Sequence, residues 1–405
     1  MDFKEGLEPV SPTGQYFTSS VLSISIIVVF EFEVTDIKGG KQWKRVEVDV
    51  QDQVRIPIFP TGLSPEAYDG YVEDYISEIA MDQFPQNKPL WEVHIIQYPT
   101  TNAAGNLIFK FHHSLGDGYT LMGVLISCLQ RADNPSLPLT FASRRRRLGL
   151  ENDLSPIRSG DEGLEFRPTT ISTITFSLDH IKFIKTKLGV SINDVITGIV
   201  LYGSRLYMQE ISHKSSREHS TAIVLLNTRT ISGYKSVQEM VKLDSDAPWG
   251  NRVTYLYVPI PKISELKSMN PLEFVLRAHK IIKKQRNSSL VYFNSSLLTI
   301  IDKLRGPEAA ARYIYKAISH SSMMISNMIG PMEQMALANH PVKGFYFMTA
   351  GIPQSLNITM MSYMGDLRVA IGSEKGFLDP HKFKSSIDNA FAMTLKAAYE
   401  ISTRK

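Results

Sequence analysis

Short apolar runs alternate with amphipathic stretches along most of this chain. Where apolar and polar side chains alternate one by one, the pattern is typical of a strand. Where apolar side chains recur every three or four residues, it is typical of a helix. On these two periods the first part of the chain predicts strands at residues 21–34, 43–50, 91–96 and 107–111, and helices at 71–81 and 119–130.

The pattern breaks over residues 131–170, where prolines gather and apolar clusters are few, which indicates a linker. Beyond it, Ser191 stands three residues before Asp194, a capping-box spacing that predicts the start of a helix. The second part of the chain predicts strands at 171–178, 221–227, 252–260, 323–327, 344–348, 357–363 and 367–372, and helices at 179–188, 192–208, 271–285, 295–304, 308–318 and 380–399.

Strands and helices therefore mix without the regular alternation of a Rossmann or barrel layout. With 405 residues the chain is too long for one ordinary core, so two domains are expected. We predict an α+β sandwich with mixed sheets, divided into an N-terminal domain at 1–140, a linker at 141–170 and a C-terminal domain at 171–405.

Composition narrows the class of protein only a little. The net charge of +4 is too weak to argue for a nucleic-acid partner but is compatible with an anionic lipid surface or an anionic cofactor. The single cysteine, Cys128, excludes an internal disulfide and a cysteine-based zinc site, and favours a reducing compartment. The apolar runs are shorter than the ~20 residues that a membrane span needs, so we expect buried elements instead.

One segment concentrates chemistry: Phe111-His112-His113-Ser114-Leu115-Gly116-Asp117-Gly118. It follows a predicted strand and precedes a predicted helix. Proton transfer needs an imidazole that is held at one angle, in one tautomer, facing a cavity. The two glycines indicate a tight turn beside the histidines, and strained turns cluster at functional sites.

Three kinds of site could use this segment. A shared metal ion is disfavoured because adjacent residues of a strand point to opposite faces, and no further ligands stand at suitable spacing. A pair of core histidines with satisfied hydrogen bonds is the simplest alternative. General base catalysis, with one histidine facing the reactants and the other facing away, is the third.

The motif and its surroundings resemble a known family. His-His-x-x-x-Asp-Gly is similar to the active-site motif of coenzyme-A-dependent acyltransferases with the chloramphenicol acetyltransferase fold. Together with Pro89-Leu90-Trp91, Asn193-Asp194, Ser326-Asn327-Met328-Ile329-Gly330-Pro331 and Glu8-Pro9-Val10-Ser11-Pro12, it resembles the wax ester synthase/diacylglycerol acyltransferase family, and the plant O-acyltransferase members most closely.

The resemblance implies a two-domain fold with the active site at the domain interface, and a role for each motif residue. His113 would be the general base that takes the proton of an alcohol while its oxygen attacks an acyl-CoA thioester. His112 would support the turn, Asp117 would brace the loop, and Gly118 would permit the turn conformation. Acyl-CoA is a co-substrate in this scheme, and neither a cofactor nor a metal ion is implied.

Other residues are assigned to substrate binding. The resemblance makes the Asn193 and Asn327 amides candidate donors to the oxyanion and places Asp194 beside them. It also implies that Pro89, Leu90 and Trp91 lie near the site, where they pack or touch substrate. Asn251 could line the cleft, although a turn residue satisfied by backbone bonds is the simpler interpretation.

The expected activity is transfer of a long-chain acyl group from acyl-CoA to a long-chain alcohol, to diacylglycerol, or to both. One alternative is a soluble acyltransferase for phenolic or alkaloid hydroxyls, but the Asp-Phe-Gly-Trp-Gly motif of that class is missing where Gly365-Asp366-Leu367 stands. Another is a non-catalytic acyl-CoA- or lipid-binding protein, because the chain looks short for the family, after Ile37 and after Arg147.

The substrates of the expected acyl transfer are themselves lipids. We therefore expect peripheral or weakly anchored association with the cytosolic face of the endoplasmic reticulum, or with the plasma membrane.

Overall fold

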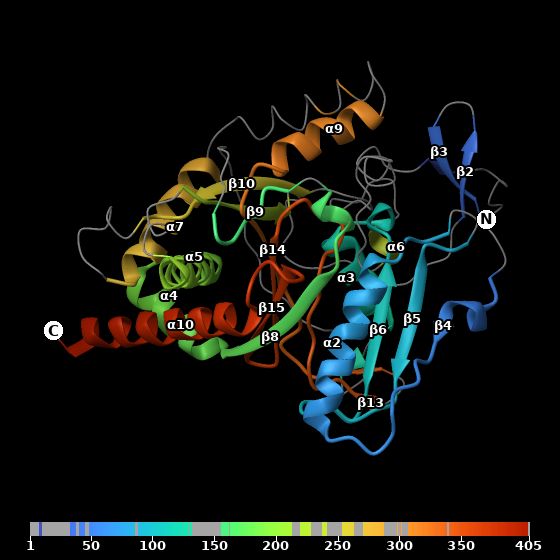
Figure 1. Cartoon of the computed structure of the whole chain (residues 1–405), viewed down its shortest axis with the longest axis horizontal. Coiled ribbons are helices and arrows are strands. Elements are labelled where there is room, and N and C mark those ends of the chain that lie inside the picture. Colours follow the sequence, from blue (N-terminus) through green and yellow to red (C-terminus); the bar gives the residue numbers. More distant parts are fainter. Residues whose placement is uncertain are drawn as a thin grey trace.

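We describe the chain from a computed structural model, in which two halves lie side by side (Figure 1). The structure describes residues 8–9, 33–37, 40–44, 48–85, 88–128, 130–131, 155–161, 163–212, 219–227, 237–240, 253–262, 270–286, 298, 301, 307–337 and 340–403.

The N-terminal half is built around a sheet of order β4-β5-β6. Its side chains alternate between two covered faces. Those of one parity, among them Trp91 and Phe111, pack with α3, and those of the other parity, among them Ile96 and Ile108, pack under α2. The elements of this half are β1 (Glu8–Pro9), β2 (Glu33–Ile37), β3 (Gly40–Lys44), η1 (Val50–Gln53), β4 (Val54–Arg55), α2 (Pro65–Met81), β5 (Trp91–Ile96), β6 (Asn106–Phe111), η2 (His113–Leu115), α3 (Gly118–Cys128) and β7 (Gln130–Arg131).

The C-terminal half is built around a six-stranded mixed sheet of order β10-β9-β11-β14-β15-β8. The parallel pairs β9–β11 and β11–β14 lie at its centre and antiparallel pairs at its edges. Its elements are η3 (Leu164–Phe166), β8 (Thr169–Ser177), α4 (Leu178–Leu188), α5 (Ile192–Ile211), β9 (Thr221–Asn227), α6 (Val237–Met240), β10 (Val253–Pro259), α7 (Leu272–Arg286), α9 (Pro307–Ile318), β11 (Met323–Ile329), β12 (Met335–Leu337), β13 (His340–Pro341), β14 (Leu356–Tyr363), β15 (Asp366–Glu374) and α10 (Pro380–Thr403).

Helix α5 organises the layer that covers one face of this sheet. It begins at the predicted capping box, in which the Ser191 and Asp194 side chains each bind the other residue's backbone N–H. Two glycines let neighbouring helices approach it closely. A Cβ on Gly198 would lie 2.5 Å from Val275 Cα of α7, and one on Gly203 would lie 2.9 Å from Ile387 Cα of α10. The largest core of the protein forms between this helical layer and the sheet.

The opposite face of the six-stranded sheet is covered by α9 at one end and meets the N-terminal half at the other. Ile171 of β8 packs against Tyr68, Val72 and Ile76 of α2, and Figure 1 shows α2 between β8 and the smaller sheet. A backbone link also joins the halves, since β7 pairs with β12. The predicted domain boundaries at 140 and 170 stay a prediction, whereas the mixed two-half sandwich is confirmed.

The prediction of a strand at residues 344–348 is wrong. Residues 342–349 have no regular secondary structure and lie against the sheet. Side chains of β14, and not the backbone of a neighbouring strand, donate to the carbonyl oxygens of this segment. Asn357 Nδ2 donates to Thr349 O, and the Thr359 hydroxyl donates to Phe347 O. Most of the strand predicted at 21–34 and of the helix predicted at 295–304 lies outside the described residues.

Candidate functional site

The histidine segment forms a short turn between β6 and α3. His112 keeps extended backbone angles, and its N–H donates to Leu90 O at 3.0 Å, which continues the β5–β6 pairing. The 3-10 turn His113–Leu115 follows, with the Leu115 N–H bound to His112 O at 3.1 Å. Backbone bonds on both sides therefore hold the two histidines in place.

His112 caps this turn with its own side chain. Its Nδ1 accepts from the Ser114 N–H at 3.3 Å and lies 2.8 Å from the Ser114 hydroxyl. The ring also packs edge-on against Phe84, with 6.3 Å between the centroids. These contacts are compatible with the supporting role that the resemblance implied for His112, which stays a prediction.

His113 is 8% exposed and begins the capped turn. Because the backbone at His112 is extended, the two imidazoles leave the chain towards opposite sides. His113 therefore leaves on the same side as Phe109 and Phe111, where α3 packs. The two histidines thus leave the chain on opposite sides, as predicted, and the reacting role of His113 stays a prediction.

Asp117 acts as the N-cap of α3. Its Oδ1 accepts the Thr120 N–H at 3.0 Å, its backbone carbonyl accepts the Leu121 N–H at 2.9 Å, and the residue is fully buried. An aspartate in this position satisfies backbone donors that a helix start leaves open. The expectation that Asp117 braces the loop agrees with this geometry.

The expectation of a strained glycine turn is wrong. Gly116 has a φ of 165°, which is ordinary extended backbone, and Gly118 is not among the glycines of positive φ. Gly118 instead lies close to a side chain of the other half. A Cβ there would lie 2.5 Å from the sulfur of Met328, so the start of α3 touches β11 across the two halves.

Pro89-Leu90-Trp91 forms part of the wall beneath the turn. Leu90 and Trp91 are buried in a cluster with Phe111, Leu115 and Leu121. This packing supports the prediction that the motif lies near the site. The Trp91 indole N–H is buried without a hydrogen-bond partner among the described residues, and a direct contact with substrate stays a prediction.

The structure brings the two candidate oxyanion donors together. Asn327 Nδ2 donates to Asn193 Oδ1 at 3.3 Å. However, Asn327 and Met328 are successive residues of β11, so the asparagines lie on the opposite face of the sheet from the contact with Gly118. This placement favours a structural pair, and the oxyanion role stays a prediction.

Asp194 is occupied by structural contacts. Its Oδ2 accepts the Ser191 N–H at 2.8 Å and lies 2.8 Å from His279 Nδ1 on α7. The carboxylate therefore caps α5 and links it to α7, and its assignment to substrate binding stays a prediction. Asn251 lies outside the described residues.

A buried polar network, which the sequence pattern did not single out, lies on the other face of β5 and β6. Lys110 is 1% exposed and lies across the strand pair from Glu92. Glu92 Oε2 is 3.4 Å from His94 Nε2, and His94 Nδ1 is 2.7 Å from the Tyr75 hydroxyl. Alternating charges on a strand usually indicate a solvated face, and only the covering helix α2 shows otherwise.

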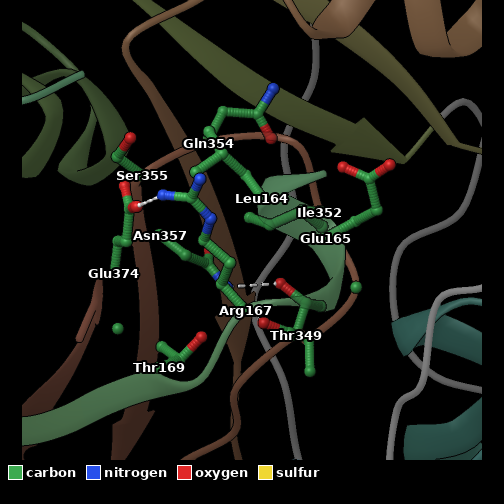
Figure 2. Close-up of a pocket in the computed structure, with 13 residues that line it drawn as sticks. Leu164, Glu165, Arg167, Thr169, Thr349, Ile352, Gln354, Ser355, Asn357 and Glu374 are labelled. Atoms are coloured by element: carbon green, nitrogen blue, oxygen red, sulfur yellow. Dashed lines mark hydrogen bonds and ion pairs between the residues drawn. The ribbon is translucent and has the colours of Figure 1, made fainter. Parts of the chain in front are cut away.

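The enclosed pocket in Figure 2 lies elsewhere, where the linker meets the starts of β8 and β14 and the end of β15. Arg167 binds Glu374 at its mouth, and Gln354 and Asn357 line it. Its enclosed volume is about 20 Å³, room for roughly one water molecule. None of the residues singled out from the sequence lines it, so we do not assign substrate to this pocket.

Within the described residues, no cluster of three or more His, Cys, Asp or Glu side chains could hold a metal ion. Among the helices that the structure describes, none is both long and apolar enough to span a bilayer.

Comparison with known proteins bears on the whole chain. Residues 249–394 match the family model of the WS/DGAT C-terminal domain. Wax ester synthase/diacylglycerol acyltransferase 11 of Arabidopsis thaliana is 25% identical over 470 residues, which cover 97% of this chain and 96% of the relative. Wax ester synthase/diacylglycerol acyltransferase 4 of the same plant is 27% identical, and the alignment covers 94% of this chain and 88% of that relative.

The first of these alignments is longer than the 405 residues of the chain, so that relative contains segments which this chain lacks. The expectation that the chain is short for the family is therefore confirmed.

Solved structures show the same fold. The wax ester synthase/diacylglycerol acyltransferase of Marinobacter aquaeolei VT8 superposes with a TM-score of 0.63 at 15% identity, covering 96% of this chain and 99% of the other. The EpoB cyclization-docking bidomain of Sorangium cellulosum superposes with a TM-score of 0.56 at 13% identity, covering 98% of this chain and 86% of the other. The chain is therefore similar to the wax ester synthase/diacylglycerol acyltransferase proteins over almost its whole length, and its residues 249–394 match the model of their C-terminal domain, as its motifs predicted.

Proposed function

We propose that this protein transfers a long-chain acyl group from acyl-CoA to the hydroxyl of a long-chain alcohol or of diacylglycerol, with His113 as general base. The observation that carries the proposal is the placement of His113. It stands in a turn capped by His112, at the start of a helix whose Gly118 touches β11 of the other half. The names of the relatives support acyl transfer, and the choice of acceptor is our inference.

In this mechanism His113 removes the proton of the alcohol while the oxygen attacks the thioester carbonyl. The C–S bond then breaks, and the same imidazolium returns the proton to the departing thiolate of coenzyme A. Both substrates are held together, so no acyl-enzyme is required. His112 stays bound to Ser114 throughout and keeps the turn in place.

We also propose that the protein works at the cytosolic face of the endoplasmic reticulum or at the plasma membrane, as a peripheral protein. The support is chemical, because fatty alcohols and diacylglycerol reside in bilayers. No cofactor is part of the proposal beyond acyl-CoA as co-substrate.

The test is turnover by the purified chain with palmitoyl-CoA and either hexadecanol or dioleoylglycerol, followed by release of free thiol. We expect His113→Ala to lower the rate at least 100-fold, because general base catalysis contributes ~10²–10⁴-fold. The matched control is His219→Ala, which removes an exposed imidazole that lies beside Lys262.

Other outcomes would point elsewhere. Transfer to phenolic acceptors and none to fatty alcohols would favour the soluble acyltransferase alternative. Binding of palmitoyl-CoA without thiol release would contradict an enzyme and favour a lipid-binding protein. Full activity of His113→Ala would refute the role of the imidazole.

A further inference from the structure

The chain between α2 and β5 is attached to the histidine segment at three described points. Lys110 Nζ donates to Asp82 O at 2.8 Å, just after the end of α2. Phe84 contacts both the Lys110 ammonium and the His112 ring. Leu90 O accepts the His112 N–H. Lys110 of β6 and His112, which follows the end of β6, lie two positions apart on the same face of the extended chain and hold this connection against the turn.

Lys110 is an unusual residue for this place. Its side chain is 1% exposed, and burial lowers the pKa of its ammonium group. Burying a charge is costly unless it is paired, and apolar residues of similar volume often serve stability better. Here the ammonium has the Asp82 carbonyl, the Phe84 ring at 4.5 Å and Glu92 Oε2 at 4.0 Å.

Phe84 contacts both side chains. It is half-buried and belongs to the edge of the cluster formed by Leu90, Trp91 and Phe111. Its ring meets the His112 imidazole at 78°, the edge-to-face arrangement that aromatic pairs prefer. A tilt of the His112 ring would move the Ser114 bond and, with it, the turn that carries His113.

We propose that Phe84 is a positioning residue, whose ring, held by the Lys110 ammonium, fixes the His112 imidazole and so aims His113. The inference rests on the proposed function, because it gives His113 the reacting role. It adds that Phe84 acts on His113 indirectly, through His112. Phe84 itself touches no substrate in this scheme.

The test compares Phe84→Leu, which keeps apolar bulk but removes the ring, with Phe84→Tyr, which keeps the ring. Lys110→Met keeps the stem and removes the charge. We expect Phe84→Leu to lower kcat about tenfold, because a displacement of a catalytic group by about 1 Å can lower a rate by about 100-fold and the loss of the ring should shift His113 by less than that. KM should stay within about twofold of wild type. Phe84→Tyr should restore most of the turnover, and Lys110→Met should lower kcat as well.

Controls separate positioning from stability. Phe166 is 59% exposed, and Phe166→Leu should leave kcat unchanged. Thermal unfolding of each variant shows how much protein is folded at the assay temperature. The proposal is overturned if Phe84→Leu keeps wild-type kcat, if its loss only matches the unfolded fraction, or if Phe84→Tyr is equally impaired.

A measurement that does not depend on turnover distinguishes the test of the Phe84 positioning role from the test of the proposed acyl transfer. Nitrogen-15 spectra of labelled histidines report the tautomer and the titration of His112 and His113. We expect the His112 and His113 signals to move in Phe84→Leu and to return in Phe84→Tyr. If His113→Ala remained active, the proposed reaction would fail, while unchanged histidine spectra in Phe84→Leu would overturn the positioning role alone.

Discussion

Replacing Gly118 by alanine tests the contact that joins the histidine segment to the C-terminal half. The added Cβ would lie 2.5 Å from Met328 Sδ and 3.2 Å from its Cε. Non-bonded heavy atoms prefer about 3.5–4.0 Å, so the overlap with sulfur exceeds roughly 1 Å. Either the thioether or the start of α3 must move.

The substitution should affect both the stability of the protein and the rate of the reaction. Overpacking of a core typically costs about 1–3 kcal/mol, and a flexible thioether places this case near the lower end, at about 1 kcal/mol of unfolding free energy. The effect on the reaction should be larger. A displacement of about 1 Å at a catalytic group can lower a rate by up to roughly 100-fold. We expect Gly118→Ala to lower kcat at least tenfold.

A double-mutant cycle separates this contact from other effects. Met328→Ala removes the thioether, so the double variant has room for the new Cβ and should recover about half or more of the lost activation free energy. We expect a coupling of about 0.5–3 kcal/mol between Gly118 and Met328. Thiol release and urea unfolding are measured for all four proteins. Additive effects, with coupling under about 0.5 kcal/mol, would refute the contact between the halves.

Two further predictions concern stability. Gly198→Ala should lower the unfolding free energy by about 3 kcal/mol, because its Cβ would lie 2.5 Å from the Val275 backbone, which cannot rotate away. Gly70→Ala, with nothing within 4 Å, should raise it by about 0.5–1 kcal/mol; urea unfolding that ranked the two the other way would contradict the helix packing. The His94 imidazole, 3.4 Å away, lowers the pKa of Glu92 below its usual 4.5, so the stability that this contact contributes is present above that pH and lost as pH falls through the lower, folded-state pKa. Unfolding free energy should therefore fall less steeply below pH 4.5 in Glu92→Gln than in wild type, and equal slopes would count against this linkage.

Local pattern was sufficient to locate most elements. The strands at 91–96 and at 221–227 were predicted to the residue, because the alternation of the first and the continuous apolar run of the second both lie within the strand itself. The segment 344–348 misled for the same reason. Its aromatic and apolar side chains fit a strand, but whether a neighbour pairs with its backbone depends on residues far along the chain.

The candidate site, too, was predicted only in part from the sequence. Strand alternation and the resemblance together identified the two histidines and their different surroundings. What could not be predicted was the reason for the glycines, because a close approach such as that of Gly118 to Met328 involves a partner some 200 residues away, and sequence spacing carries no sign of it. The Lys110 network escaped notice because a charged strand face looks solvated until a helix is known to cover it.

The alternation along β6 also sets a rule for how this sequence can change. Phe109 and Phe111 share one face of the strand, and Lys110 and His112 share the other. One residue inserted between Asn106 and Phe111 would exchange these sets, turning His112 towards α3 and His113 towards Phe84. Two inserted residues would restore both. An insertion inside the strand therefore preserves these two faces only in even steps, whereas an insertion in the connection between β5 and β6 leaves the alternation before the histidines unchanged.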